Sequence, residues 1–170
     1  DTFNLHNGSI LNTGDLSNDT FQTIVYAPAS DIALLAGPTL TANKSFQEVD
    51  IRPGSLTSGQ SRTLGQMGSA TTANLHYVFP SGFEVQSGGI LNVSNGAKVF
   101  IPNVQTIAVD AGGSMTVGAA TVTLDNYNGG GYGITVAGTL TATGSTFAPT
   151  RVAFGTGSGI TALSCCHFKA

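Results

Sequence analysis

The amino-acid sequence predicts an all-β fold, a parallel β-solenoid in which short strands stack as successive coils. Glycine (23 of 170 residues) and β-branched residues are frequent throughout the chain, while strong helix formers are scarce. Apolar and polar residues alternate with the two-residue period of a half-buried strand. A motif of two short strands around a glycine recurs along the chain, which indicates a repeat architecture. An antiparallel β-sandwich is the alternative fold for the same strands.

The recurring motif reads apolar–x–apolar–x–small–Gly–x–(x)–apolar–polar. Its clearest copies are "FEVQSGGILN" from Phe83 and "IAVDAGGSMT" from Ile107. The seven copies begin at Phe3, Ile32, Val49, Phe83, Ile107, Ile134 and Val152, at intervals of 17 to 34 residues. One copy alone buries too little apolar surface, so the copies are expected to stack around a shared core. We therefore predict one domain over residues 1–170 with about seven coils.

Equivalent apolar positions of stacked coils are expected to form inward ladders. The first predicted ladder is Leu5, Leu34, Ile51, Val85, Val109, Val136 and Phe154. The second is Leu11, Leu40, Leu56, Leu91, Met115, Leu140 and Ile160. Glycine at the bend between them permits a positive φ and a close approach of neighbouring backbones, so the glycines are expected to form the corners of the solenoid.

Two intervals between copies are long. Residues 16–31 hold an apolar, β-prone run, from which we expect residues 1–31 to be an N-terminal coil with a cap. Residues 57–80 are expected to be a projecting loop and a strand. The loop is placed at residues 57–73 because this part is rich in Ser, Gly, Gln and Thr.

The stretches "YVFPSGFEVQSGGILNVSNGAKVFIPN" and "SGITALSCCHF" resemble a known architecture. They are similar to the right-handed parallel β-helix of the pectin-lyase-like superfold, and more closely to noncatalytic repeat segments of bacterial surface and secreted adhesin-type proteins. This resemblance implies an extracellular or cell-surface location. It also implies a structural or adhesive role without enzymatic activity.

The charge of the chain argues against several classes of partner. Six basic and nine acidic residues give a net charge of −3, and no basic run occurs. Nucleic-acid binding needs clustered Lys and Arg, so nucleic acid is not an expected partner. No apolar run approaches the roughly 20 residues of a membrane-spanning helix.

Outward positions of the motif are expected to bring Asp50, Arg52, Glu84 and Asp110 onto one face. Carboxylates beside an arginine can hold calcium or an acidic sugar, which makes this face a candidate glycan or calcium site. Pectate lyases, which share the superfold, use such a face with calcium and a basic residue, so the resemblance adds polysaccharide cleavage as an alternative. The other interpretation is that solvated charges prevent aggregation of the sheet. No cofactor is expected unless this face binds calcium.

Two further surface features suggest ligands. Tyr127 and Tyr132 lie in the Gly-rich stretch "DNYNGGGYG", where exposed rings could stack on a sugar, although an ordinary turn also explains the stretch. A polar column is expected beside the second ladder, at Asn12, Thr41, Thr57, Asn92, Thr116, Thr141 and Thr161. Such a column could order water, which gives ice binding as a further alternative, although the column beside it is interrupted by Ile10, Ile90 and Gly159.

The end of the chain holds its two cysteines. Alternation places Cys165 and Cys166 on opposite faces, and we expect Cys165 to be buried and Cys166 to be exposed or paired with another chain. The run Cys165-Cys166-His167 lacks the ligand spacing of a metal site. Because "SCCHFKA" stops inside a strand-like segment, we expect end-to-end self-association or continuation in a larger chain.

These observations favour a noncatalytic extracellular structural or adhesive module, either a stalk or the subunit of a self-assembling filament. A carbohydrate-binding or polysaccharide-cleaving β-helix is the first alternative. An ice-binding solenoid is the second.

Overall fold

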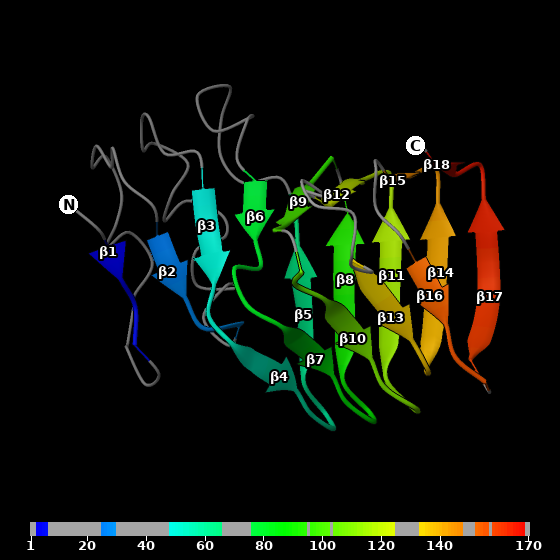
Figure 1. Ribbon diagram of the computed structural model, residues 1–170, viewed down its shortest axis with the longest axis horizontal. Helices are drawn as coiled ribbons and strands as arrows, with labels where there is room; N and C mark the ends of the chain where they lie inside the picture. Colours follow the sequence, from blue (N-terminus) through cyan, green and yellow to red (C-terminus); the bar gives the residue numbers. More distant parts are fainter. Residues whose placement is uncertain are drawn as a thin grey trace.

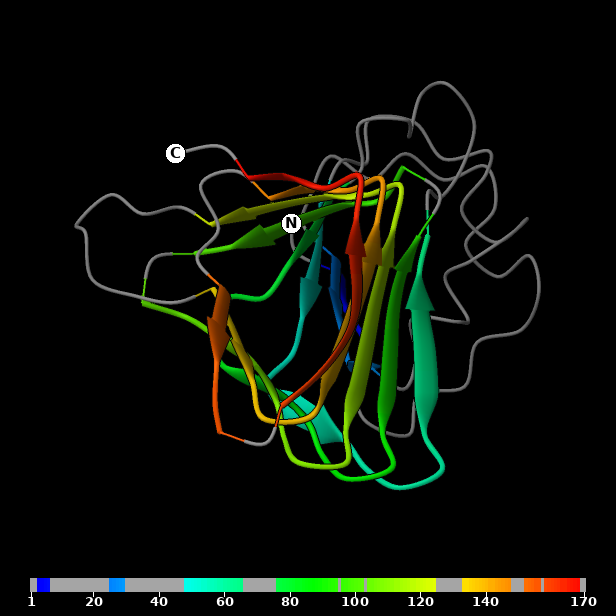
Figure 2. The ribbon, with the colours of Figure 1, turned by 90° about the vertical axis from the view of Figure 1, so that its right-hand side faces the viewer.

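The computed structural model describes residues 3–6, 25–29, 48–65, 76–94, 96–102, 104–124, 133–147, 152–156 and 158–168. The described residues form eighteen strands in three sheets. Figure 1 shows the strands side by side along the longest axis, from β1 at one end to β17 and β18 at the other. Figure 2 looks along this axis and shows the three sheets as the sides of a prism.

The eight-stranded sheet, here sheet 1, contains β1 (Phe3–Asn4), β2 (Val25–Ala27), β3 (Glu48–Ile51), β6 (His76–Val78), β9 (Lys98–Ile101), β12 (Thr121–Leu124), β15 (Thr146–Phe147) and β18 (His167–Phe168). Sheet 2 contains β4 (Gly54–Leu56), β7 (Phe83–Val85), β10 (Ile107–Val109), β13 (Ile134–Val136) and β16 (Val152–Phe154). Sheet 3 contains β5 (Ser61–Leu64), β8 (Ile90–Ser94), β11 (Ser114–Gly118), β14 (Thr139–Thr143) and β17 (Gly159–Ser164). From β3 onward the chain visits the three sheets in turn, and one strand from each sheet makes a rung, whereas β1 and β2 both belong to sheet 1.

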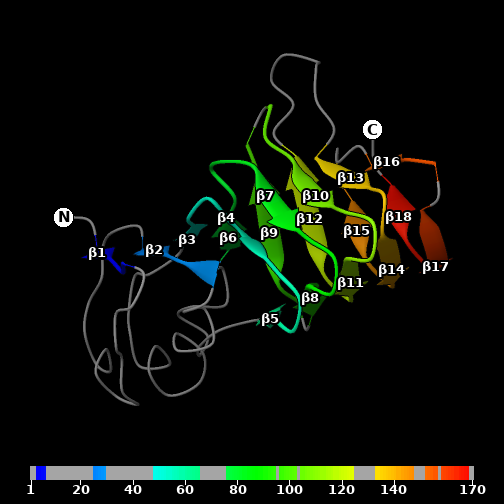
Figure 3. The same ribbon diagram turned by 90° about the horizontal axis from the view of Figure 1, so that it is seen from below.

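All strand pairs in the described part of the chain are parallel. The prediction of an all-β parallel β-solenoid is therefore confirmed, and the antiparallel β-sandwich is excluded. The pairing is in register except for one irregularity between β14 and β17. Figure 3 shows the same succession of rungs from below.

The number of coils was overestimated, since the structure has about four turns and not seven. The copies from Phe83, Ile107, Ile134 and Val152 each run from sheet 2 into sheet 3. The copy from Val49 instead runs from β3 in sheet 1 into β4 in sheet 2, one sheet out of phase. The copy from Ile32 lies outside the described residues.

The predicted ladders are correct in the C-terminal half. Val85, Val109, Val136 and Phe154 pair in register in sheet 2. In sheet 3 the register joins Leu91, Met115, Leu140 and Ile160.

The N-terminal members of both ladders were assigned to the wrong columns. Ile51 pairs with Ala27 in sheet 1, and Leu56 is the residue that pairs with Val85. The position before Leu91 in sheet 3 is held by Arg62. Leu5 is buried beside sheet 1, where its N–H donates to the carbonyl of Tyr26 at 2.9 Å. Leu11, Leu34 and Leu40 lie outside the described residues.

Sheet 1 supplies a ladder that the motif did not predict. Its consecutive members are Val49, Tyr77, Val99, Val122 and Phe147, all of them buried. The Tyr77 hydroxyl donates to the carbonyl of Gly65 at 2.7 Å, which satisfies a polar group that burial would otherwise penalise. Burial also raises the pKa of Tyr77. The core lies between the three sheets.

The glycine corners are confirmed where the chain passes from sheet 2 to sheet 3. Gly59, Gly88 and Gly112 have φ values of +79°, +74° and +81°, which side chains rarely tolerate. Gly89 and Gly113 follow the second and the third of these residues, and a Cβ at either position would collide with a carbonyl oxygen of the preceding turn. Glycine is therefore required both by conformation and by space.

A second corner joins sheet 3 to sheet 1. Gly96, Ala119, Gly144 and Cys165 all have positive φ there. The residue that follows each of them is small: Ala97, Ala120, Ser145 and Cys166, of which the first three are buried. Cys165 is exposed and Cys166 is half-buried, and both are free thiols, so the predicted burial of Cys165 is wrong. The reason is that the corner interrupts strand alternation at Cys165.

Ser145 is a buried polar residue at this corner, and its replacement tests the corner's hydrogen bonds. Its Oγ lies 3.0 Å from the carbonyl of Val117, to which it can donate, and 3.4 Å from the amide of Ala120, from which it accepts. We expect Ser145→Ala to lower the free energy of unfolding by about 1 kcal/mol. Urea denaturation measures this, with Ser114→Ala on the half-exposed outer face of β11 as a control expected to have no effect. Equal effects of the two changes would contradict the assignment.

The long intervals contain strands of the solenoid. Within residues 1–31, β1 and β2 belong to sheet 1. Within residues 57–80, β5 belongs to sheet 3 and β6 to sheet 1. The beginning of this second interval is therefore a strand and not the expected loop, while residues 66–75 lie outside the described part.

Candidate functional site

The four charged residues predicted to share a face lie on two sheets. Asp50 belongs to β3 in sheet 1, where it pairs with Tyr26 and Val78, and Arg52 follows this strand. Glu84 belongs to β7 in sheet 2, and Asp110 follows β10 in the same sheet. The predicted face is therefore not formed as one surface, because the copy from Val49 is one sheet out of phase. Tyr127 and Tyr132 lie outside the described residues.

Titratable side chains come together on the outer side of sheet 1. One column holds Glu48, His76 and Lys98 on consecutive strands, and the neighbouring column holds Tyr26 and Asp50. We call these five residues the sheet-1 cluster. Consecutive strands of a sheet lie about 4.8 Å apart, so side chains in one column are direct neighbours. The alternation of Glu48 and Asp50 was visible in the sequence, but their column partners depend on the correct phase of the repeat.

Glu48 and His76 form an ion pair within the cluster. His76 Nε2 lies 3.2 Å from Glu48 Oε2, and both side chains are about one-third exposed. A pair of this exposure contributes at most about 1 kcal/mol when the histidine is protonated. Its main effect is to hold the Glu48 carboxyl close to the outer face of β3 and β6.

Asp50 is the unusual member of the cluster. It is 5 % exposed, and its Oδ1 has no hydrogen-bond partner among the described residues. Burial, followed by the nearby Glu48 carboxyl, raises the pKa of Asp50 to about 7, and a hydrogen bond with Tyr26 opposes this shift. The charge of Asp50, followed by burial, raises the pKa of Tyr26. A carboxyl that titrates near neutral pH can exchange a proton under ordinary conditions.

Arginines tie strands together at the N-terminal end. Arg52 Nε donates to the carbonyl of Leu5 at 3.1 Å, and Nη2 donates to Asn4 Oδ1 at 2.9 Å. Arg62 Nε donates to the carbonyl of Ala29 at 3.0 Å. These bonds join residues that are 33 to 48 positions apart in the sequence, so both arginines hold neighbouring turns together.

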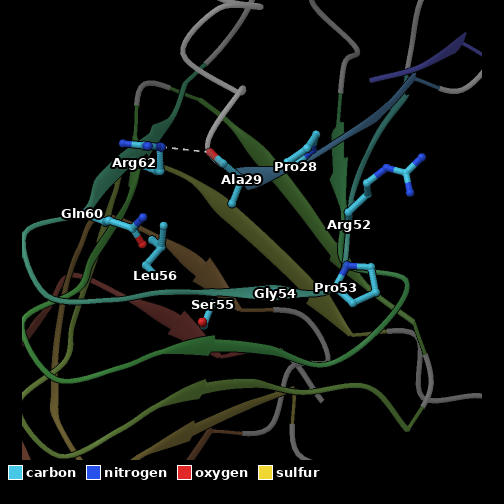
Figure 4. Close-up of a pocket in the computed structure, with 9 residues that line it drawn as sticks. All are labelled: Pro28, Ala29, Arg52, Pro53, Gly54, Ser55, Leu56, Gln60 and Arg62. Carbon is cyan, nitrogen blue, oxygen red and sulfur yellow. Dashed lines mark hydrogen bonds between the residues drawn. The ribbon is translucent and has the colours of Figure 1, made fainter. Parts of the chain in front are cut away.

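A hollow of about 270 Å³ lies between these two arginines. Figure 4 shows their guanidinium groups pointing to opposite sides and away from each other, with Ala29 and Pro28 between them. The amide oxygen of Gln60, which also lines the hollow, accepts from the backbone N–H of Thr57 at 2.8 Å. Arg52, Arg62 and Gln60 are thus engaged in bonds within the chain, and the two positive charges do not converge on one point.

A second, shallower hollow of about 450 Å³ lies on the outer side of sheet 2. Its centre is the column of Ser55, Glu84 and Ala108, which are aligned on consecutive strands. Gln86 Nε2 donates to Glu84 Oε2 at 2.9 Å. This hollow contains one of the four predicted site residues.

The polar column on sheet 3 is partly as predicted. Asn92, Thr116 and Thr141 pair in register, and Thr63, not Thr57, precedes Asn92. Thr161 is out of the column, because the irregularity between β14 and β17 pairs Thr141 with Ala162. Asn12 and Thr41 lie outside the described residues.

Metal ligands are not clustered in the described part of the chain. Among the described residues, no group of three or more His, Cys, Asp or Glu side chains is placed to hold a metal ion. The same part of the chain contains no helix long and apolar enough to span a bilayer. Comparison of the chain with protein-family models, with curated proteins and with solved structures finds no match in any of the three.

Proposed function

We propose that this chain is a noncatalytic structural module of an extracellular or cell-surface protein, acting as a rigid stalk or adhesive segment. We also propose that the solenoid is a right-handed β-helix of the pectin-lyase-like superfold, similar to the repeat segments of adhesin-type proteins. Its main support is the continuity of the rungs. Sheet 1 joins eight strands without a break in the described part, and sheets 2 and 3 each join five.

Rung continuity supports this role because each turn from β3 onward is bonded to its neighbours on three sides. Bending the prism would stretch the hydrogen bonds of at least one sheet and separate the side chains of its inward ladder. Close-packed interiors resist such deformation. A chain built in this way holds its two ends at a fixed separation, which is what a stalk requires.

Single-molecule energy transfer tests this proposal. One fluorescent protein is fused to each end of the chain, and a Gly/Ser linker of 170 residues serves as the control. We expect one narrow distance distribution for the chain and a broad one for the flexible linker. A distribution as broad as that of the linker would overturn the proposal.

Carbohydrate binding is the second candidate, favoured by the hollow on sheet 2 around Glu84. Shallow polar hollows on flat sheets suit extended sugars, with the carboxylate accepting hydrogen bonds from hydroxyls. A glycan array with and without calcium tests it, followed by Glu84→Gln on any sugar that binds. No binding in either condition, and no cleavage of acidic polysaccharides, would exclude this candidate.

Ice binding is a third candidate function, supported by fewer residues than the predicted polar column contained. Ser114 and Thr139 pair in one column of sheet 3, beside Thr116 and Thr141 in the next. These four hydroxyls form a small regular array on the outer face. Thermal hysteresis and ice shaping at high protein concentration are the measurements, and their absence would exclude this function.

A further inference from the structure

One oxygen of the sheet-1 cluster is buried without a hydrogen-bond donor. Asp50 is 5 % exposed, and its Oδ1 has no partner among the described residues. Buried side-chain oxygens in proteins nearly always have a partner, and where the protein supplies none a bound ion or water is a recognised explanation. The orphaned oxygen is therefore the observation that points to a ligand at this place.

A second carboxyl lies beside Asp50 and belongs to Glu48. The two residues are separated by one position in β3, so both side chains leave the same face of the strand. Burial, followed by the hydrogen bond and the charge of Glu48, raises the pKa of Asp50 to about 7. Two carboxyl groups form a hydrogen bond only while they hold a proton between them, and they repel each other once both are ionised. A cation that binds both carboxylates removes this repulsion.

Asp50 has no ion-pair partner in the described part of the chain. His76 contacts the other carboxylate, with Nε2 3.2 Å from Glu48 Oε2, and it carries a charge only when protonated. Arg52 follows Asp50 by two positions, but its guanidinium donates to oxygens of residues 4 and 5. An ionised Asp50 is therefore a buried carboxylate with one oxygen available for a cation.

We propose that Glu48 and Asp50 bind a divalent cation of the calcium type, with the Tyr26 hydroxyl orienting the Asp50 carboxylate. Hard divalent cations prefer carboxylate oxygens and complete their coordination with carbonyl oxygens and water. The Glu48 side chain is about one-third exposed, so the ion reaches the pair from solvent and keeps part of its water shell. This site differs from the calcium face expected from the sequence, which grouped Asp50 with residues of sheet 2.

The composition of the site sets its expected affinity. Two carboxylates are fewer than the three or more charged side chains of a dense metal centre, and water has to supply most other ligands. Calcium sites in extracellular modules have dissociation constants of about 10⁻⁴ to 10⁻³ M, and affinity rises with the number of charged ligands. We expect a value near the weak end of this range, about 10⁻³ M.

Protons compete with the cation for the same oxygens. With the pKa of Asp50 at about 7, lowering the pH from 8 to 5.5 should weaken binding by about 30-fold. Protonation of His76 beside Glu48 weakens it further, whereas Lys98 on the next strand of that column is charged at both pH values. Tyr26 stays un-ionised over this range, because the charge of Asp50 and then burial raise its pKa.

Calcium chloride titration at pH 8, followed by the chemical shifts of backbone amides, tests the site. We expect saturable shifts centred on Tyr26, Glu48, Asp50 and His76. Asp50→Asn should raise the dissociation constant by about 10-fold or more, because it removes one of the two charged ligands. The matched control is Glu84→Gln, which removes an exposed carboxylate of sheet 2 and should leave the constant unchanged. Circular dichroism confirms that both variants fold, and sodium chloride at equal ionic strength separates binding from screening.

Three results would overturn the inference. The first is the absence of saturable shifts up to about 10⁻² M calcium, tenfold above the expected constant, which would leave water alone at Asp50 Oδ1. The others are an Asp50→Asn variant that binds as tightly as wild type, and an affinity that is equal at pH 8 and pH 5.5. None of these results bears on the rigidity of the prism, so the energy-transfer test of the proposed function stands independently.

Discussion

Replacing Asp50 by asparagine is expected to raise the free energy of unfolding at pH 8 by about 4 kcal/mol. The carboxyl has a pKa of about 7 in the folded chain, against 3.8 without the fold's influence. The folded state therefore holds the proton more tightly than the unfolded state, and stability falls as the pH rises from about 4 to about 7. Asparagine cannot ionise, so the variant avoids this loss.

The pH dependence separates this mechanism from a general packing effect. At pH 4 Asp50 is protonated in the folded chain, so the same substitution should change stability by less than about 1 kcal/mol. Urea denaturation at several pH values measures both results. Glu84→Gln, an exposed carboxylate in sheet 2, is the control and should change stability by no more than about 0.5 kcal/mol at pH 8. Destabilisation of the Asp50→Asn variant at pH 8 would contradict this account, because it would mean that the hydrogen bond with Tyr26 outweighs the cost of burying the carboxylate.

Gly113→Ala is expected to destabilise the solenoid by about 3 kcal/mol or more. A Cβ at this position would lie 2.2 Å from the carbonyl oxygen of Val85 and 3.0 Å from that of Gln86. Both oxygens belong to the backbone of the preceding turn, so they cannot move without shifting a whole rung. The amide of Gly113 also donates to the carbonyl of Asp110 at 2.8 Å, which fixes its position further.

Gly118→Ala is the matched control for this experiment. Gly118 lies in β11, a Cβ at this position would have no described heavy atom within 4 Å, and its φ is not positive. Alanine there should be neutral or slightly stabilising, because glycine weakens a strand interior. Gly138→Ala repeats the test one turn later, with a Cβ 2.2 Å from the carbonyl oxygen of Asp110. Thermal melts that show equal effects at Gly113 and Gly118 would contradict the close approach of the turns.

The sequence predicted the solenoid best where the repeat carries a glycine. From Phe83 to Ile160 each turn has its glycine or small-residue corner between sheets 2 and 3. This corner marks the same position in every copy, so the sequence alone aligns the two ladders correctly. Sheet 1 has no such marker, because its strands are entered through varied corners and loops. Its ladder through Tyr77 and Val99 was therefore missed.

The error in phase at Val49 has a physical cause. The segment Arg52-Pro53-Gly54 matches the glycine bend of the motif in sequence. In the structure, however, it turns the chain from sheet 1 into sheet 2 and not from sheet 2 into sheet 3. Because of this error in phase, the prediction placed Asp50 on the same face as Glu84 and Asp110, although Asp50 lies in sheet 1. Burial of a carboxyl on the outer side of a sheet cannot be inferred from alternation, because alternation assigns that side to solvent. The sheet-1 cluster could therefore not be predicted from the sequence alone.

The ladders and the corners both depend on the parallel, in-register stacking of the turns. Nuclear Overhauser contacts between backbone protons of neighbouring strands test this stacking most directly. We predict contacts joining Thr116 to Thr141 and Met115 to Leu140, together with the same parallel offset between β10 and β13. Contacts that run in opposite directions along these strands, as in an antiparallel pair, would contradict the stacking.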